Sequence, residues 1–415
     1  MKLGVVYHMP FWRDAEGRLR EIEGSFARYV DSLAPYFDEV LVCAPFLKTA
    51  KGEGTLVRSA NVRLAPLPYF AGPVQFYPQL PAMVWPLVRF VREIDLLHCR
   101  IPTPAAFLLD RIARWMGRPM FCLVVTDLDA LLDSMPYTGI KRRLWRAYTA
   151  FEERTVQRMA DRSLTFANGG ALATKHSRPG HAVLETRTTT IDRDDIFERD
   201  DTCAGPQIRI LTVSRLDPRK GLRILPEVIR YLVDHGCDAA LDIIGPSIGA
   251  PGDAERAAIE ADAVARDVAD RVRVLGGVPL DQLLQRYRSY DLFVLPTLPG
   301  EGIPRVLLEA MASGVPIVTS RVSGIPSLIV HETNGLLVDN PSAATVADAL
   351  WRLVEDGALR RRLIASGYDT ARSLTLQHQA ARMMAIVSSE LGVTLRQPAP
   401  EPVPHVASAF RRTAR

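Results

Sequence analysis

The sequence is poor in cysteine and has no long apolar run. Its 415 residues include five cysteines, an odd number without C-x-x-C spacing. This argues against a disulfide framework or a thiolate metal site, and we expect buried free thiols in a reducing compartment. The amino-terminal MKLGVVYHMP has one lysine and too short an apolar stretch for a secretory signal.

No run of 18 or more apolar residues occurs, and the best candidate, 73–91, is broken by three prolines and Arg89. We therefore expect no membrane span and a cytoplasmic protein. A net charge of +4 is too small to indicate nucleic-acid binding, so no nucleic-acid partner is expected. It suits anionic small molecules or peripheral contact with an anionic membrane.

The length exceeds what one ordinary core holds, and short apolar runs alternate with helical patterns. This predicts an α/β protein of two doubly wound domains, residues 1–192 and 206–375. The acidic, aperiodic stretch 193–205 is expected to be the linker. A helix over 376–395 and a disordered Pro- and Arg-rich tail, 396–415, follow.

The most informative stretch is 291–320, DLFVLPTLPGEGIPRVLLEAMASGVPIVTS. It predicts a buried strand over 291–295, a breaker-rich loop, a helix starting at Pro304 and a second strand over 315–319. That order is the unit of a doubly wound sheet, whose ligands bind at the carboxyl ends of the strands.

Two carboxylates mark this unit. Glu301 lies in the loop and Glu309 lies eight residues on, so both lie near one side of the helix. The helix amino terminus between them suits a phosphate, and the carboxylates would accept hydrogen bonds from ribose and sugar hydroxyls. For an arbitrary pair, two solvated glutamates would be the simpler interpretation.

The strings Glu301-Gly302-Ile303-Pro304 and Glu309-Ala310-Met311-Ala312-Ser313-Gly314-Val315-Pro316 resemble the E-x7-E signature of retaining glycosyltransferases of the GT4-like group. The likeness continues through 323–326, Ile329 and 334–338. It implies a GT-B fold, with two Rossmann-like domains facing across a cleft. The acceptor would bind in the first domain and the nucleotide-sugar in the second, and the helix over 376–395 would pack back on the first domain.

The resemblance also assigns roles to single residues. Arg215 and Lys220 follow the predicted strand 208–213, where both cations can converge on one anion. In the family such residues hold the donor diphosphate, the first Glu contacts the transferred sugar and the second holds the ribose. The implied catalytic set is Arg215, Lys220 and Glu301, and the donor-binding set is Gly24, Asp127, Val278, Gly302, Ile303, Pro304 and Glu309.

Two of these positions leave alternatives open. The family usually has two adjacent glycines after its first strand, whereas this chain has only Gly24, which would equally serve as a helix cap. Where the family has a histidine that contacts the donor sugar, this chain has Thr126 and Asp127. Asp127 would take over that contact, or activity would be lost.

Asp127 and Asp129 also form a D-x-D pair, which in another glycosyltransferase fold binds a divalent ion. The resemblance implies a metal-independent enzyme, so we expect no metal and no cofactor beyond the nucleotide-sugar co-substrate. His98 and Arg100, expected at the carboxyl end of a strand over 94–98, are candidate cleft residues.

Two segments of the first domain suggest an acceptor or membrane surface. The aromatic, proline-rich stretch 66–90 would form irregular core or an exposed apolar ledge. The predicted helix 141–162 begins with four cations around aromatic residues, which favours a solvated face or docking on anionic lipid.

Together these features predict a hexosyltransferase that moves a sugar from a nucleotide-diphosphate donor to an acceptor hydroxyl with retention of configuration. The acceptor would be a saccharide or lipid-linked saccharide in surface polysaccharide or glycolipid assembly. Two alternatives remain open: an inactive scaffold that binds nucleotide-sugar, or a GT-B phosphorylase or epimerase.

Overall fold

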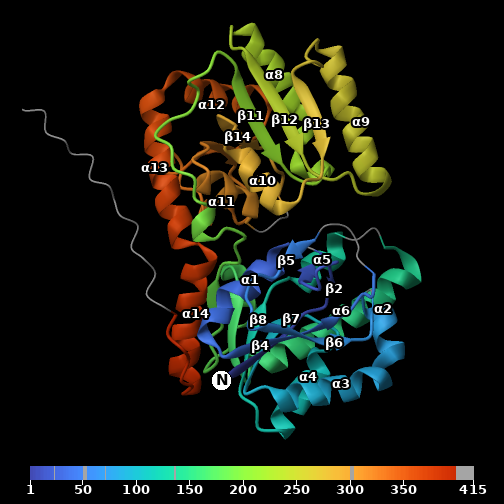
Figure 1. Cartoon of the computed structure of the whole chain (residues 1–415). Helices are drawn as coiled ribbons and strands as arrows, with labels where there is room; N and C mark the ends of the chain where they lie inside the picture. Colours follow the sequence, from blue (N-terminus) through green and yellow to red (C-terminus); the bar gives the residue numbers. More distant parts are fainter. Residues whose placement is uncertain (23, 50–53, 71, 135–136, 300–302, 399–415) are drawn as a thin grey trace, which may run out of the picture.

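The computed structural model of the chain describes residues 1–398 except 23, 50–53, 71, 135–136 and 300–302. Two parallel β-sheets, each covered by helices, form two domains that face each other (Figure 1). Four buried clusters of apolar residues lie on the two faces of the two sheets. Each sheet is thus buried on both sides, as parallel sheets require.

The first sheet has seven strands in the order β10-β9-β8-β7-β1-β4-β6, and its registered pairs are all parallel. Nearly continuous apolar sequence explains its buried central strands. The strands are β1 (Lys2–Val6), β4 (Glu39–Pro45), β6 (Val62–Leu67), β7 (Leu96–Ile101), β8 (Met120–Val124), β9 (Leu164–Asn168) and β10 (Leu184–Thr186). The order reverses between β1 and β7, so a ligand crevice is expected at their carboxyl ends.

Helices α3, α4 and α6 cover one face of this sheet and α1 the other, where Phe26 and Val30 are fully buried. The helices of the first domain are α1 (Ser25–Leu33), α2 (Pro73–Phe76), α3 (Leu80–Glu93), α4 (Ala106–Trp115), α5 (Leu128–Ser134), α6 (Gly139–Ala160) and α7 (Gly170–His176). The stretch 66–90 is therefore largely helical rather than irregular. Phe76 and Phe90 are buried in it, whereas Trp85 is 65% exposed.

The segment between β1 and α1 is partly regular. It contains β2 (Phe11–Arg13) and β3 (Leu19–Glu21), which form a small antiparallel sheet with β5 (Thr55–Leu56). Phe11 and Trp12 of β2 are fully buried. The strand-forming partner, β5, lies too far along the chain for a local pattern to reveal it.

The second sheet has six parallel strands in the order β13-β12-β11-β14-β15-β16. These are β11 (Ile208–Val213), β12 (Ala239–Ile244), β13 (Val272–Gly276), β14 (Leu292–Leu295), β15 (Ile317–Ser320) and β16 (Leu336–Val338). The helices are α8 (Leu225–Asp234), α9 (Gly249–Ala265), α10 (Leu280–Tyr287), α11 (Arg305–Ala312), α12 (Ala343–Glu355) and α13 (Gly357–Ser373). Here the order reverses between β11 and β14.

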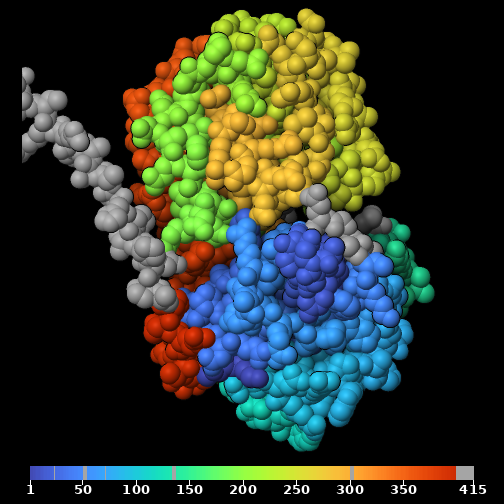
Figure 2. Space-filling view, viewed as in Figure 1, coloured from blue at the N-terminus to red at the C-terminus, as the bar shows by residue number. Residues whose placement is uncertain are grey.

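The chain crosses between the domains twice. The segment between β10 and β11 bonds to the second domain, where Phe197 N–H donates to the Ala312 carbonyl over 2.8 Å. Further on, α14 (Leu376–Leu391) returns to the first domain along one side of the molecule (Figure 2). Met383 and Val387 of α14 pack into the cluster formed by α1 and the first sheet. The relative position of the domains is therefore held by packed side chains as well as by the linker.

Candidate active site

The loops that follow β11 and β14 meet at the point where the second sheet reverses its order. Leu298 N–H donates to the Arg219 carbonyl over 2.7 Å, and Thr297 Oγ1 donates to the same oxygen over 3.2 Å. Lys220, the next residue, is buried, whereas Arg215 is exposed. The Lys220 loop is thus bonded directly to the segment that leads into α11.

The carboxyl ends of β12 and β13 lie at the same edge of the second sheet. Gly245 packs so closely that a Cβ there would lie 1.7 Å from the Ser214 carbonyl oxygen, and its N–H donates to Gly276 over 2.8 Å. Only glycine permits this approach. Val278 follows, half-buried at the start of α10. Four strand ends therefore converge at one edge.

Helix α11 begins at Arg305, and Pro304 is its N-cap residue rather than its first helical residue. Among the described residues no side chain caps this end, and the first N–H groups of a helix have no partner within the helix itself. Ile303 is half-buried beside it. Glu301 and Gly302 lie outside the described residues, and their predicted contacts stay predictions.

Glu309 lies in the middle of α11 and is only 3% exposed. Its Oε1 accepts a hydrogen bond from Thr190 Oγ1 over 2.8 Å, and its Oε2 lies 3.1 Å from Tyr287 Oη. Burial raises the pKa of the carboxyl, while Thr190, Arg305 and Tyr287 oppose that rise. It is thus a buried, oriented carboxylate rather than a solvated one.

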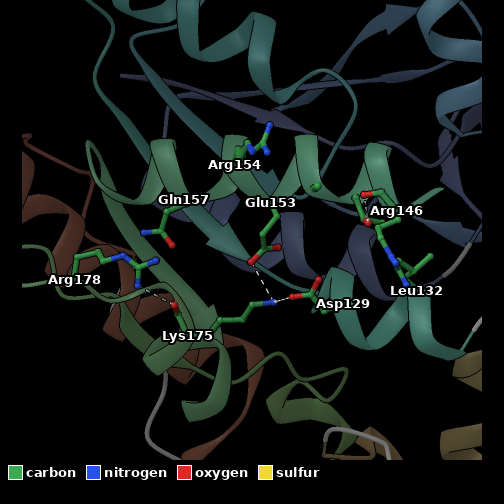
Figure 3. A pocket seen from close by; sticks show the side chains of 10 residues that line it. Asp129, Leu132, Arg146, Glu153, Arg154, Gln157, Lys175 and Arg178 are labelled. Atoms are coloured by element: carbon green, nitrogen blue, oxygen red, sulfur yellow. Dashed lines mark hydrogen bonds and ion pairs between the residues drawn. The ribbon is translucent and has the colours of Figure 1, made fainter. Parts of the chain in front are cut away.

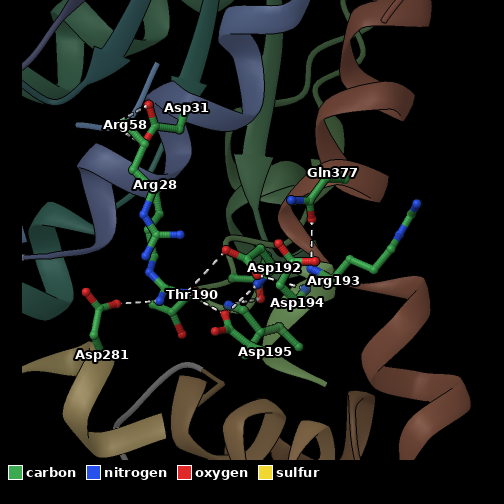
Figure 4. Close-up of polar contacts among 12 residues, drawn as sticks. Arg28, Asp31, Arg58, Thr190, Asp192, Arg193, Asp194, Asp195, Asp281 and Gln377 are labelled. Carbon is green, nitrogen blue, oxygen red and sulfur yellow. Dashed lines mark hydrogen bonds and ion pairs between the residues drawn. The ribbon is translucent and has the colours of Figure 1, made fainter. Parts of the chain in front are cut away.

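A buried cation joins the two domains beside this carboxylate. Arg28 on α1 donates from Nη1 to the Thr190 carbonyl over 3.1 Å and pairs with Asp195. Its Nη2 lies 2.5 Å from Asp281 Oδ1 on α10 (Figure 4). One guanidinium therefore contacts the first domain, the linker and the second domain.

Gly24 is the N-cap residue of α1 and has a left-handed backbone with φ of +83°. Its N–H donates to Glu21 Oε2 over 2.8 Å. A Cβ there would lie 2.9 Å from Thr55 Oγ1 and 3.8 Å from Leu280 Cβ in the second domain. Gly24 therefore serves as the helix cap, one of its two predicted roles, and lies beside α10 of the second domain, while its predicted donor contact stays a prediction.

Asp127 follows β8 and caps α5, because its Oδ1 accepts the Asp129 N–H over 3.0 Å. Lys175 Nζ lies 2.8 Å from both Asp127 and Asp129 and 3.1 Å from Glu153. Burial alone would raise the pKa of Asp127, but the bond from Lys175 lowers it below its ordinary value. A lysine thus lies among the carboxylates of the D-x-D pair.

Lys175 lies in a cavity of about 560 Å³ between α5, α6 and α7 (Figure 3). Among the described residues, Arg146 and Arg178, which also line it, have no carboxylate partner. The cavity therefore presents carboxylate oxygens at its centre and guanidinium groups around them. A second cavity, of about 370 Å³, also belongs to the first domain, and neither is lined by Arg215, Lys220 or Glu309.

His98 is not a cleft residue, because β7 continues beyond it to Ile101. Its side chain is fully buried, its ring lies 4.2 Å from the Phe121 ring at 7°, and its Nε2 lies 2.8 Å from Tyr29 Oη. Burial lowers the pKa of His98 to about 3. Arg100 is half-buried, and its guanidinium lies 5.0 Å from the Tyr29 ring centre.

The sequence alone did not identify Arg28, Thr190, Tyr287 or Lys175. Thr190 and Glu309 are 119 positions apart, and Arg28 and Asp281 are 253 apart. No local spacing relates residues so distant.

Within the described part of the chain, no group of three or more His, Cys, Asp or Glu side chains is placed to hold a metal ion. Nor does any described helix combine the length and hydropathy needed to cross a bilayer.

Residues 195–370 match the family described as Glycosyl transferases group 1. The amylovoran biosynthesis glycosyltransferase AmsK of Erwinia amylovora is 34% identical over 189 residues, 44% of this chain and 45% of that protein. A GDP-mannose-dependent alpha-(1-6)-phosphatidylinositol monomannoside mannosyltransferase of Mycobacterium tuberculosis is 34% identical over 217 residues, 51% of this chain and 54% of that protein. The chain thus matches about half the length of these curated relatives.

Solved structures resemble the whole described chain. Sucrose-phosphate synthase from Thermosynechococcus elongatus has a TM-score of 0.68 at 16% identity, covering 94% of this chain and 99% of that one. HepE of Anabaena in complex with UDP has a TM-score of 0.66 at 17% identity, covering 94% and 100%. These likenesses show the fold, and the predicted GT-B architecture is confirmed.

Proposed function

We propose that the chain is a retaining glycosyltransferase, because residues 195–370 match the family described as Glycosyl transferases group 1. It would move a sugar from a nucleotide-diphosphate donor to an acceptor hydroxyl. The observation that carries this proposal is the bonded pair of loops at the reversal of the second sheet, where the Lys220 loop meets the segment that leads into α11. Such reversals are where doubly wound sheets bind their ligands.

The donor diphosphate would lie against Arg215, Lys220 and the amino-terminal end of α11. Positive charge and N–H groups there stabilise the negative charge that develops on the leaving diphosphate. No protein nucleophile and no metal are needed in this scheme. Glu309 would accept the ribose hydroxyls, and the apposed first domain would exclude water from the reacting atoms.

The acceptor would bind at the cavity around Lys175 in the first domain. The carboxylates of Asp129 and Glu153 would accept hydrogen bonds from sugar hydroxyls, and Arg146 and Arg178 would bind an anionic group of the acceptor. The named relatives act in amylovoran biosynthesis and on a phosphatidylinositol monomannoside. These favour surface polysaccharide or glycolipid assembly for this chain.

Peripheral membrane contact would place the enzyme beside a lipid-linked acceptor. At the start of α6, Ile140 is 78% and Leu144 is 67% exposed, one turn apart on one face. Lys141 and Arg143 are exposed between them, and residues 137–151 contain no acidic side chain. An apolar stripe flanked by cations suits an anionic bilayer surface.

The test is a binding and turnover assay on the full chain. We expect UDP, GDP or ADP to raise the melting temperature, and the matching nucleotide-sugar to be consumed only when a saccharide acceptor is present. Failure of all three nucleotides to bind would refute the donor site. Binding without turnover on any acceptor would instead favour the scaffold, and consumption of donor with phosphate alone would favour the phosphorylase.

A further inference from the structure

The Glu309 carboxylate belongs to the second domain but is held by a residue outside its sheet. Thr190 lies between β10 and the linker, is 3% exposed, and donates its hydroxyl to Glu309 Oε1 over 2.8 Å. Tyr287 of α10 lies 3.1 Å from the other oxygen. A carboxylate has about four acceptor positions, so these two bonds fix its plane and leave about two acceptor positions unused.

Thr190 is in turn held by Arg28. The guanidinium donates to the Thr190 carbonyl over 3.1 Å while its other end lies 2.5 Å from Asp281 Oδ1 across the seam (Figure 4). The Arg28 side chain is only 5% exposed, and a planar guanidinium bound at both ends has one geometry. The position of Thr190 therefore depends on the first domain lying against α10.

We propose that Thr190, held by Arg28, is a positioning residue that orients the Glu309 carboxylate toward the donor ribose. The inference rests on the proposed function, since it takes Glu309 as the acceptor of the ribose hydroxyls. It adds that the ribose site is complete only when α1 of the first domain is docked on α10 of the second. Donor recognition and domain apposition are thereby coupled through one series of contacts, Asp281–Arg28–Thr190–Glu309, in which Arg28 bonds the Thr190 backbone carbonyl and the Thr190 hydroxyl bonds Glu309.

The decisive variant is Thr190→Val, which removes the hydroxyl and keeps the branched shape. Thr189→Val is the matched control, because Thr189 is its buried neighbour and, among the described residues, its hydroxyl accepts a hydrogen bond only from Ile191 N–H, over 3.3 Å. The probes are the nucleoside diphosphate that binds the wild type and its 2′,3′-dideoxy form. Dissociation constants for both are measured by calorimetry.

We expect Thr190→Val to weaken the ribonucleotide about tenfold, as loss of a hydrogen bond to a charged group would do. The dideoxy nucleotide should already bind about tenfold more weakly to the wild type, and Thr190→Val should weaken it no further. Thr189→Val should leave both constants unchanged. A merely structural role for Thr190 would weaken both nucleotides equally, and that result, or no effect at all, overturns the proposal.

Arg28→Lys tests the second link while keeping a positive charge, because an ammonium cannot bond Thr190 and Asp281 in the same fork. We expect the same ribose-specific loss, and equal effects on both nucleotides would overturn the role of Arg28. A wild type that binds both nucleotides equally would refute the inference and the ribose contact of Glu309, and would leave the proposed diphosphate site standing. A wild type that binds neither would refute the donor site as well.

Discussion

A Cβ atom on Gly221 would lie 2.1 Å from the carbonyl oxygen of Pro296. Gly221 follows Lys220 in a left-handed turn with φ of +67°, and Pro296 begins the loop that leads to α11. A separation below 3 Å against backbone cannot be accommodated without movement. The close approach of these two loops therefore holds the Lys220 turn against the segment that leads to α11.

Gly221→Ala should separate the two loops and weaken nucleotide binding at least tenfold, measured by calorimetry. The control is Gly236→Ala, which has a similar φ of +82° but open space around its Cβ position. Both variants should lose about 1 kcal/mol of stability from the left-handed backbone. Only Gly221→Ala should lose affinity, and equal affinities would mean that the loop contact does not form the donor site.

Arg215→Ala and Lys220→Ala should each weaken nucleoside diphosphate binding by tenfold to a hundredfold, because hydrogen bonds to charged groups contribute about 1.5–3 kcal/mol each. The thermal shift caused by nucleotide should shrink accordingly. Arg230→Ala, which removes a cation paired with Asp234 on the surface of α8, should leave binding unchanged. A full nucleotide shift in both site variants would contradict the assignment.

Glu309→Gln should stabilise the protein at neutral pH while weakening nucleotide binding. The folded-state pKa of Glu309 is raised above its ordinary value of 4.5, so the folded protein binds this proton more tightly than the unfolded chain. The stability that this bound proton contributes is complete below pH 4.5 and is lost as the pH rises through the pKa of Glu309 in the folded protein. The melting temperature of the variant relative to wild type should therefore increase from pH 5 to pH 8. A constant difference would mean that Glu309 is not desolvated.

His98→Ala should lower the free energy of unfolding by about 3 kcal/mol, because it removes a fully buried ring stacked on Phe121. Urea denaturation measures the loss, and nucleotide affinity below the transition should be unchanged. A variant that kept full stability but lost turnover would indicate that His98 lines the cleft after all.

Leu144→Glu should reduce binding to vesicles containing anionic phosphatidylglycerol about tenfold in a sedimentation assay, since it places an acid in the exposed stripe of α6. Trp115→Glu is the control, because Trp115 is 75% exposed but ends α4 rather than lying on α6. Neutral phosphatidylcholine vesicles should bind weakly in every case. Equal loss in both variants would refute a specific α6 surface.

Some elements were predicted from sequence to the residue. The strand Ile208–Val213 has the predicted bounds, and the last helix begins at the predicted Leu376 but ends at Leu391 rather than at 395, because apolar periodicity and flanking breakers are local signals. The end of β7 was placed too early, since Cys99 to Ile101 continue the strand only through pairing with β8. His98 was therefore expected at the end of the strand, whereas it lies inside it.

The sequence by itself determined the two parallel sheets, the E-x7-E unit and the identity of the residues proposed to bind the donor. Only the tertiary structure decided that Glu309 is buried against Thr190, that Lys175 lies among the D-x-D carboxylates, and that Arg28 bridges the domains. The reason is physical. Helices and strands follow from patterns within a few turns, whereas the protonation, orientation and partners of a side chain depend on groups that packing brings from far along the chain.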